Sequence, residues 1–112
     1  MKKYIENLKR TQIRPCTSTR TGDAVKNQYV ILAPDIYAFQ SYNSLIAIYD
    51  RENNILTLGC DFDYSRTTSK YLHQFLYEYC YPIYRELPNG KSLCDILRKA
   101  IKSGLVKYDE KM

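Results

Sequence analysis

The feature that most constrains the fold is a turn sequence between two apolar segments near the middle of the chain. Residues 44–50 and 55–60 are rich in β-branched, aromatic and other apolar side chains, and the polar stretch between them ends in Asn53 and Asn54. Asparagine tolerates the positive φ that tight hairpin turns require. The pattern therefore predicts two antiparallel strands joined by a hairpin.

Further strands are expected on the N-terminal side of this hairpin. An unbroken apolar run covers residues 29–33 and stops at Pro34, which suits a strand buried on both faces. Residues 36–42 follow as a second candidate strand, and Asn43 marks a bend or a bulge before the hairpin. Residues 105–108 could add a short strand near the C-terminus.

Two amphipathic helices are predicted in the C-terminal half, because apolar residues recur there at spacings of three and four. The first can be capped by Asp63, Ser65 or Thr67 and ends at Tyr81, because the proline that follows disfavours α geometry in the residue before it. The second begins after Ser92 and closes at Gly104. The apolar stripes consist of Thr68, Leu72, Phe75, Leu76 and Tyr79 in the first helix, and of Leu93, Ile96, Leu97, Ala100 and Ile101 in the second.

Positive charge is concentrated in the first quarter of the chain. The net charge is +5, and residues 1–27 hold seven Lys and Arg against two acidic residues, whereas residues 28–112 hold ten of each sign. Residues 16–22 are polar and end in glycine, which is typical of a loop. We therefore expect residues 1–27 to form a basic N-terminal arm or a short helix, and residues 28–112 to form a single domain.

Together these patterns predict the α+β class. The expected architecture is a small antiparallel sheet of three or four strands packed against two C-terminal amphipathic helices. A chain of 112 residues has the usual size of one domain with one core.

Several patterns that would indicate other classes of protein do not occur in the sequence. No apolar run approaches the roughly 20 residues of a membrane span, and the first residues lack the apolar core and cleavage site of a signal peptide. The four cysteines form no CxxC pair and are accompanied by one histidine, so they are interpreted as free, mostly buried thiols and not as zinc ligands. Glycine-rich phosphate loops and a GxSxG motif are also absent. We therefore expect a cytoplasmic protein without a membrane segment or cofactor.

Catalysis has one weak candidate. Asp61 and Asp63, with Asp50 across the hairpin, could present carboxylates to a divalent ion as in a metal-dependent nuclease. Acidic residues at a strand-to-helix junction are, however, commonly turn formers and helix caps. His73 has no neighbour in sequence to act as its partner in general base catalysis. The prediction is a non-catalytic protein without catalytic or metal-binding residues.

Nucleic-acid binding has a more specific set of candidates, since cations neutralise phosphates and tyrosines stack on bases. Against this interpretation, the rest of the chain is balanced in charge and contains no established nucleic-acid-binding motif. The candidate residues are Arg66, Lys70, Tyr71, His73 and Tyr77 on the first predicted helix, with Lys2, Lys3, Lys9, Arg10 and Arg14 in the basic arm.

Two patterns in residues 36–80 carry a resemblance. An FxSYxxxIA strand spans residues 39–47, and a DYSxTTxxxL helix start spans residues 63–72. With these motifs the chain resembles a family of small uncharacterised proteins carried by bacteriophages and mobile elements. The first 27 residues and the second helix lie outside the resemblance.

The resemblance implies a function that composition does not show. Small phage accessory proteins often bind and disable a host protein, so the leading hypothesis is a stoichiometric, anti-CRISPR-like inhibitor of a host defence complex in the bacterial cytoplasm. Its partner would be a host protein or ribonucleoprotein complex, and the protein itself would be a monomer or a homodimer. The alternative is a module that binds phage or host DNA or RNA through the basic and aromatic residues named above.

Overall fold

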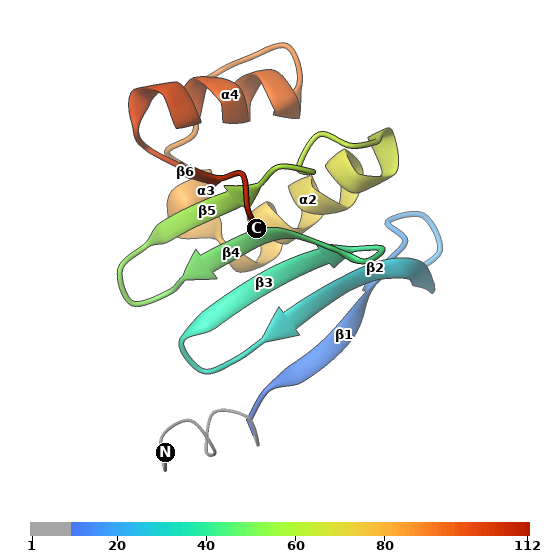
Figure 1. Cartoon of the computed structure of the whole chain (residues 1–112). Helices are drawn as coiled ribbons and strands as arrows, with labels where there is room; N and C mark the ends of the chain where they lie inside the picture. Colours follow the sequence, from blue (N-terminus) through green and yellow to red (C-terminus); the bar gives the residue numbers. More distant parts are fainter. Residues whose placement is uncertain (1–9) are drawn as a thin grey trace.

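A computed structural model describes residues 10–112 as a mixed β-sheet with helices on one of its faces. Figure 1 shows α2 and α3 lying across the sheet and α4 beyond the edge that β5 and β6 form. The strands are β1 (Gln12–Thr17), β2 (Ala24–Leu32), β3 (Ile36–Ser41), β4 (Ser44–Asp50), β5 (Ile55–Gly59) and β6 (Lys107–Asp109). The helices are α2 (Arg66–Tyr79), α3 (Tyr81–Tyr84) and α4 (Leu93–Ser103).

The strands lie in the sheet in their sequence order, β1-β2-β3-β4-β5-β6. Consecutive pairs from β1 to β5 are antiparallel, and β6 pairs with β5 in parallel. A parallel neighbour requires a long crossover connection, which here consists of the three helices. The prediction of a three- or four-stranded antiparallel sheet is therefore wrong, because the sheet has six strands and is mixed.

The two strands beyond the predicted four lie at the edges of the sheet, and β6 overlaps the short strand expected at residues 105–108, whereas β1 was not expected. In β1 only Cys16 is buried, so the strand lacks the alternating apolar pattern that reveals a strand in sequence. Its Pro15 is tolerated because an edge strand leaves one row of backbone groups unpaired. The loop predicted for residues 16–22 is thus wrong at its start, and β2 begins at Ala24, well before the predicted apolar run. These residues of the expected arm belong to the sheet.

The central hairpin is confirmed. β4 and β5 pair antiparallel, and Asn54 adopts the positive φ (52°) that the turn sequence predicted. Both main helices are also confirmed, with Ser65 as the N-cap of α2, Ser92 as the N-cap of α4, and Gly104 in the left-handed conformation (φ 84°) after α4. Proline at position 82 lies in the first turn of α3, an additional short helix that directly follows α2.

The core lies between the sheet and α2. Phe39 of β3 stacks on Phe75 of α2 with ring centroids 5.9 Å apart, and Leu72 and Leu76 are fully buried beside them. The inward residues of α2 recur every three or four positions, so the opposite side of the helix is left facing outward. No helix among residues 10–112 is both long and apolar enough to span a membrane.

Candidate functional site

The outward side of α2 carries four of the residues predicted to bind a ligand. Arg66, Lys70, His73 and Tyr77 are separated by four, three and four positions, a spacing that places them on one face of a helix, and all four are exposed. We call these four residues the outer face of α2. The fifth predicted residue, Tyr71, is 94% buried and is not part of this face.

The prediction that Tyr71 contacts a ligand is wrong, because its position on the helix places it on the buried side. It lies three positions after Thr68 and four before Phe75, both of which are buried. That spacing is the sequence signal that identifies it as a core residue. The ammonium nitrogen of Lys70 lies 5.4 Å from the centroid of the Tyr71 ring, so the two side chains form a cation–π contact.

The two cations of the outer face are not neutralised by neighbouring carboxylates. In the described part of the chain the ion pairs are Arg98 with Asp63 and Lys99 with Asp95, so neither Arg66 nor Lys70 takes part in one. A groove of about 620 Å³ runs beside them. It is lined by Asp63, Ser65, Arg66, Ser69, Lys70, His73, Ser92, Leu93, Cys94 and Ile96.

Aromatic rings extend the outer face beyond the end of α2. Tyr77 is 57% exposed and Tyr81 is 51% exposed, with ring centroids 5.9 Å apart in an edge-to-face arrangement. Tyr84 contacts both rings, and a hydrogen bond of 2.8 Å joins its hydroxyl to His73 Nε2. These contacts restrict the orientation of the rings. We call Tyr77, Tyr81 and Tyr84, which lie at the C-terminal end of the outer face and in α3, the tyrosine platform.

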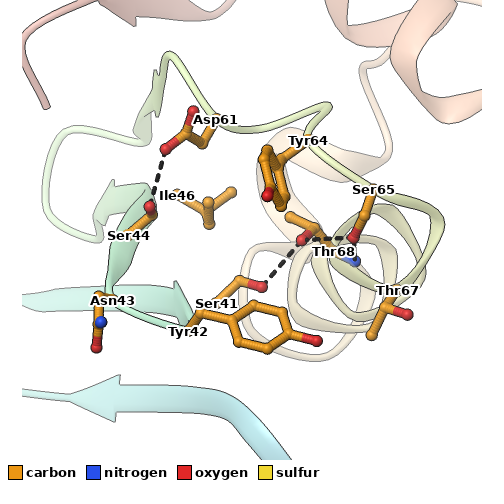
Figure 2. Close-up of a pocket in the computed structure, with 10 residues that line it drawn as sticks. All are labelled: Ser41, Tyr42, Asn43, Ser44, Ile46, Asp61, Tyr64, Ser65, Thr67 and Thr68. Atoms are coloured by element: carbon orange, nitrogen blue, oxygen red, sulfur yellow. Dashed lines mark hydrogen bonds between the residues drawn. The ribbon is translucent and has the colours of Figure 1, made fainter.

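A second feature lies at the other end of α2. A cavity of about 570 Å³ opens between the β3–β4 turn, the β5–α2 loop and the first turn of α2 (Figure 2). We call it the hydroxyl cavity, because most of its lining side chains carry a hydroxyl group. It is lined by Ser41, Tyr42, Asn43, Ser44, Ile46, Asp61, Tyr64, Ser65, Thr67 and Thr68.

Hydrogen bonds fix the walls of the hydroxyl cavity. The hydroxyls of Ser41 and Thr68 lie 2.9 Å apart and join the sheet to the helix, and Ser65 Oγ accepts a hydrogen bond of 3.1 Å from the backbone N–H of Thr68. On the opposite wall the Ser44 hydroxyl donates to Asp61 Oδ2 at 2.8 Å. No sequence pattern indicates this cavity, because three separate segments of the chain build it.

The structure describes two of the five candidate residues of the basic arm, Arg10 and Arg14. Lys2, Lys3 and Lys9 lie outside the described residues, and Arg10 is exposed just before β1. Arg14 is an exposed residue of the edge strand, where its guanidinium donates to Gln12 Oε1 at 2.7 Å. The structure therefore does not place Arg14 on the outer face of α2.

The acidic residues considered for a nuclease site are held apart by other contacts. Asp50 accepts hydrogen bonds from the backbone N–H groups of Glu52 and Asn53 in the hairpin turn, at the end of β4 remote from Asp61. Asp61 is bonded to Ser44, as described, and Asp63 pairs with an arginine of α4. Residues 10–112 contain no cluster of three or more His, Cys, Asp or Glu side chains suited to a metal ion.

The cysteines are free thiols, of which Cys16 and Cys80 are buried and Cys60 is exposed. Burial raises the pKa of Cys16 to about 11, with a further contribution from the negative charge of Glu78. Burial likewise raises the pKa of Cys80. Neither buried thiol is therefore ionised near neutral pH.

The fold and these surfaces define a small α+β protein whose exposed helix face combines unpaired cations with clustered tyrosines. The chain belongs to the family of unknown function DUF8033, whose family pattern matches residues 11–86. The match includes β1 to β5, α2 and α3, so it covers the outer face of α2 and the hydroxyl cavity. No curated protein and no solved structure matches the chain.

Proposed function

We propose that the protein binds single-stranded nucleic acid along the outer face of α2. The observation that carries this proposal is the pair of cations, Arg66 and Lys70, which are exposed and have no ion-pair partner in the described part of the chain. Unpaired cations on a surface attract a polyanion, and the counterions of the polyanion are released when its phosphates bind them.

The length of the face suits a short stretch of nucleic acid. Arg66 and Tyr77 are eleven positions apart, which corresponds to about 17 Å of helix at 1.5 Å per residue. At about 3.4 Å per nucleotide in a stacked strand, this length accommodates about five nucleotides. Phosphates would lie at Arg66 and Lys70, and bases would reach the tyrosine platform.

The exposed tyrosines favour a single strand over a duplex. A base can stack on Tyr77 or Tyr81 only when its own face is free, which is the case in a single strand, a loop or an end. Because every base has such a face, the platform by itself confers affinity with little sequence preference. Binding without chemical conversion is the activity that this surface supports.

The predicted inhibition of a bacterial defence complex stays a prediction, as do the phage origin, the host cytoplasm and the oligomeric state. An inhibitor that attached to the RNA of such a complex would use the same cations. Affinity purification from bacterial lysate, with and without nuclease treatment, separates the two functions. A defined protein complex that survives the nuclease supports the inhibitor, whereas partners that disappear with the nucleic acid support simple nucleic-acid binding.

The direct test is fluorescence anisotropy with labelled 12-nucleotide single strands. The double variant Arg66→Ala/Lys70→Ala should bind about thirtyfold more weakly or worse, because each of the two charge-assisted contacts contributes about 1 kcal/mol or more. Lys102→Ala/Lys111→Ala is the matched control, since it removes the same charge from exposed positions elsewhere. Equal losses in the two double variants, or no binding by the natural protein, would contradict the proposal.

A further inference from the structure

The hydroxyl cavity lies next to the proposed path of the nucleic acid. Ser65, the N-cap of α2, lines both this cavity and the groove beside Arg66 and Lys70. A ligand bound along the outer face of α2 therefore passes the mouth of the cavity. The cavity volume of about 570 Å³ falls within the roughly 300–1,000 Å³ range typical of small-ligand sites.

The lining of the cavity is unsuited to a phosphate group. It includes the carboxylate of Asp61 but no lysine, arginine or histidine side chain. A phosphate placed there would face the negative charge of Asp61 without compensation. The hydroxyls and the carboxylate suit a neutral group that carries N–H donors.

Two tyrosines border the cavity from different segments. Tyr42 belongs to the β3–β4 turn and is 49% exposed, and Tyr64 belongs to the β5–α2 loop and is 74% exposed. Figure 2 shows the two residues on different sides of the cavity. Tyr42 has a φ of 54°, a left-handed conformation that is costly for a bulky residue. Its backbone N–H donates to the Asn27 carbonyl at 2.6 Å, which holds the ring at the cavity in spite of this cost. Exposed, positioned aromatic rings are suited to stacking against a flat ligand.

We propose that the hydroxyl cavity binds one unpaired base that carries an amino group, that is adenine, cytosine or guanine, from the strand on α2. This inference rests on the proposed function. The amino group would donate to Asp61, because an ionised carboxylate has about four acceptor sites and the hydrogen bond from Ser44 uses one of them. Uracil and thymine present a carbonyl oxygen where adenine and cytosine present an amino group, so at that position they offer Asp61 no donor beyond the hydrogen bond from Ser44.

In this proposal, affinity and base preference arise from two different parts of the surface. The cations of the outer face bind any strand, and the cavity discriminates between bases. Discrimination should therefore depend on Asp61 and Tyr64 but not on ionic strength, whereas overall affinity should fall with salt.

The test compares 12-nucleotide oligoadenylate, oligocytidylate and oligouridylate by fluorescence anisotropy. The natural protein should bind the first two at least about fivefold more tightly than oligouridylate. Asp61→Ala and Tyr64→Ala should each reduce that preference to within about twofold while leaving oligouridylate binding unchanged. Tyr64 is largely exposed, so Tyr64→Ala should keep the fold. This variant therefore tests the site even if Asp61→Ala disturbs the loop by removing the hydrogen bond to Ser44. Asp23→Ala, which removes an equal charge from an exposed hairpin, should retain the preference.

The outcomes separate this inference from the function on which it rests. If the natural protein binds all three oligonucleotides equally, the base site is refuted and the proposed function stands. The same holds if the preference survives both Asp61→Ala and Tyr64→Ala. If none of the three binds, both the proposed function and the base site are refuted.

Discussion

Replacement of Gln28 by methionine should stabilise the protein. The Gln28 side chain is completely buried, and neither its amide nitrogen nor its amide oxygen has a hydrogen-bond partner among the described residues. An unsatisfied buried polar group costs about 1–3 kcal/mol, and methionine has a similar unbranched shape. We expect Gln28→Met to raise the free energy of unfolding by about 1 kcal/mol or more, and to raise Tm by about 4 °C per kcal/mol.

Ser41→Ala is the contrasting variant, because Ser41 lies directly opposite Gln28 in the register of β2 and β3. The Ser41 hydroxyl is buried but hydrogen-bonded to Thr68, so its removal should lower the free energy of unfolding by about 1 kcal/mol. Guanidinium denaturation followed by far-UV circular dichroism measures both, provided that the m-value is unchanged. The reasoning is refuted if Gln28→Met destabilises the protein by 1 kcal/mol or more at an unchanged m-value.

Two further predictions concern ionisable groups. When the native protein is treated with a thiol-specific disulfide reagent, Cys60 should react rapidly. Cys16 and Cys80 should react only after unfolding, because burial keeps them protonated and out of reach of the reagent. Reaction of all cysteines at one rate would contradict this prediction. The backbone N–H of Lys91 and the Lys99 ammonium lower the pKa of Asp95 below its usual 3.8, so the stability that Asp95 contributes is present above that pH and lost as the pH falls through its folded-state pKa. Asp95→Asn should therefore lose less stability than the natural protein between pH 7 and pH 3 in urea denaturation, and an equal loss would show that the carboxylate has no such role.

The parts of the fold that were predictable are those determined by local chemistry. The hairpin was found because Asn54 must adopt a positive φ, and α4 was found because Ser92 and Gly104 cap its two ends. In both cases neighbouring residues alone determine the structure.

Of the two edge strands, β6 overlaps the short strand expected at residues 105–108, whereas β1 and the pairing of β6 were not predictable by the same reasoning. β1 buries a single residue, and β6 has three exposed residues whose parallel pairing with β5 depends on the path of the intervening helices. No periodic pattern can arise in a strand with so few buried positions. Their place in the sheet follows from tertiary structure.

The candidate site shows the same division. The outer face of α2 was predictable because helical spacing alone places its residues together. The hydroxyl cavity was not, since Ser41, Asp61 and Thr68 come from different elements and meet only in the folded chain. The sequence pattern predicts a helix-capping role for the residues near position 65, and Ser65 fulfils that role.

The measurement that most directly tests nucleic-acid binding by α2 is the salt dependence of affinity for a single strand. For single strands, log K falls with log salt concentration by about 0.7 per phosphate contacted. If Arg66 and Lys70 each contact a phosphate, the double variant Arg66→Ala/Lys70→Ala should have a slope shallower by about 1.4 than that of the natural protein. Lys102→Ala/Lys111→Ala should keep the natural slope. An unchanged slope in the Arg66→Ala/Lys70→Ala variant would contradict the assignment of phosphate binding to α2.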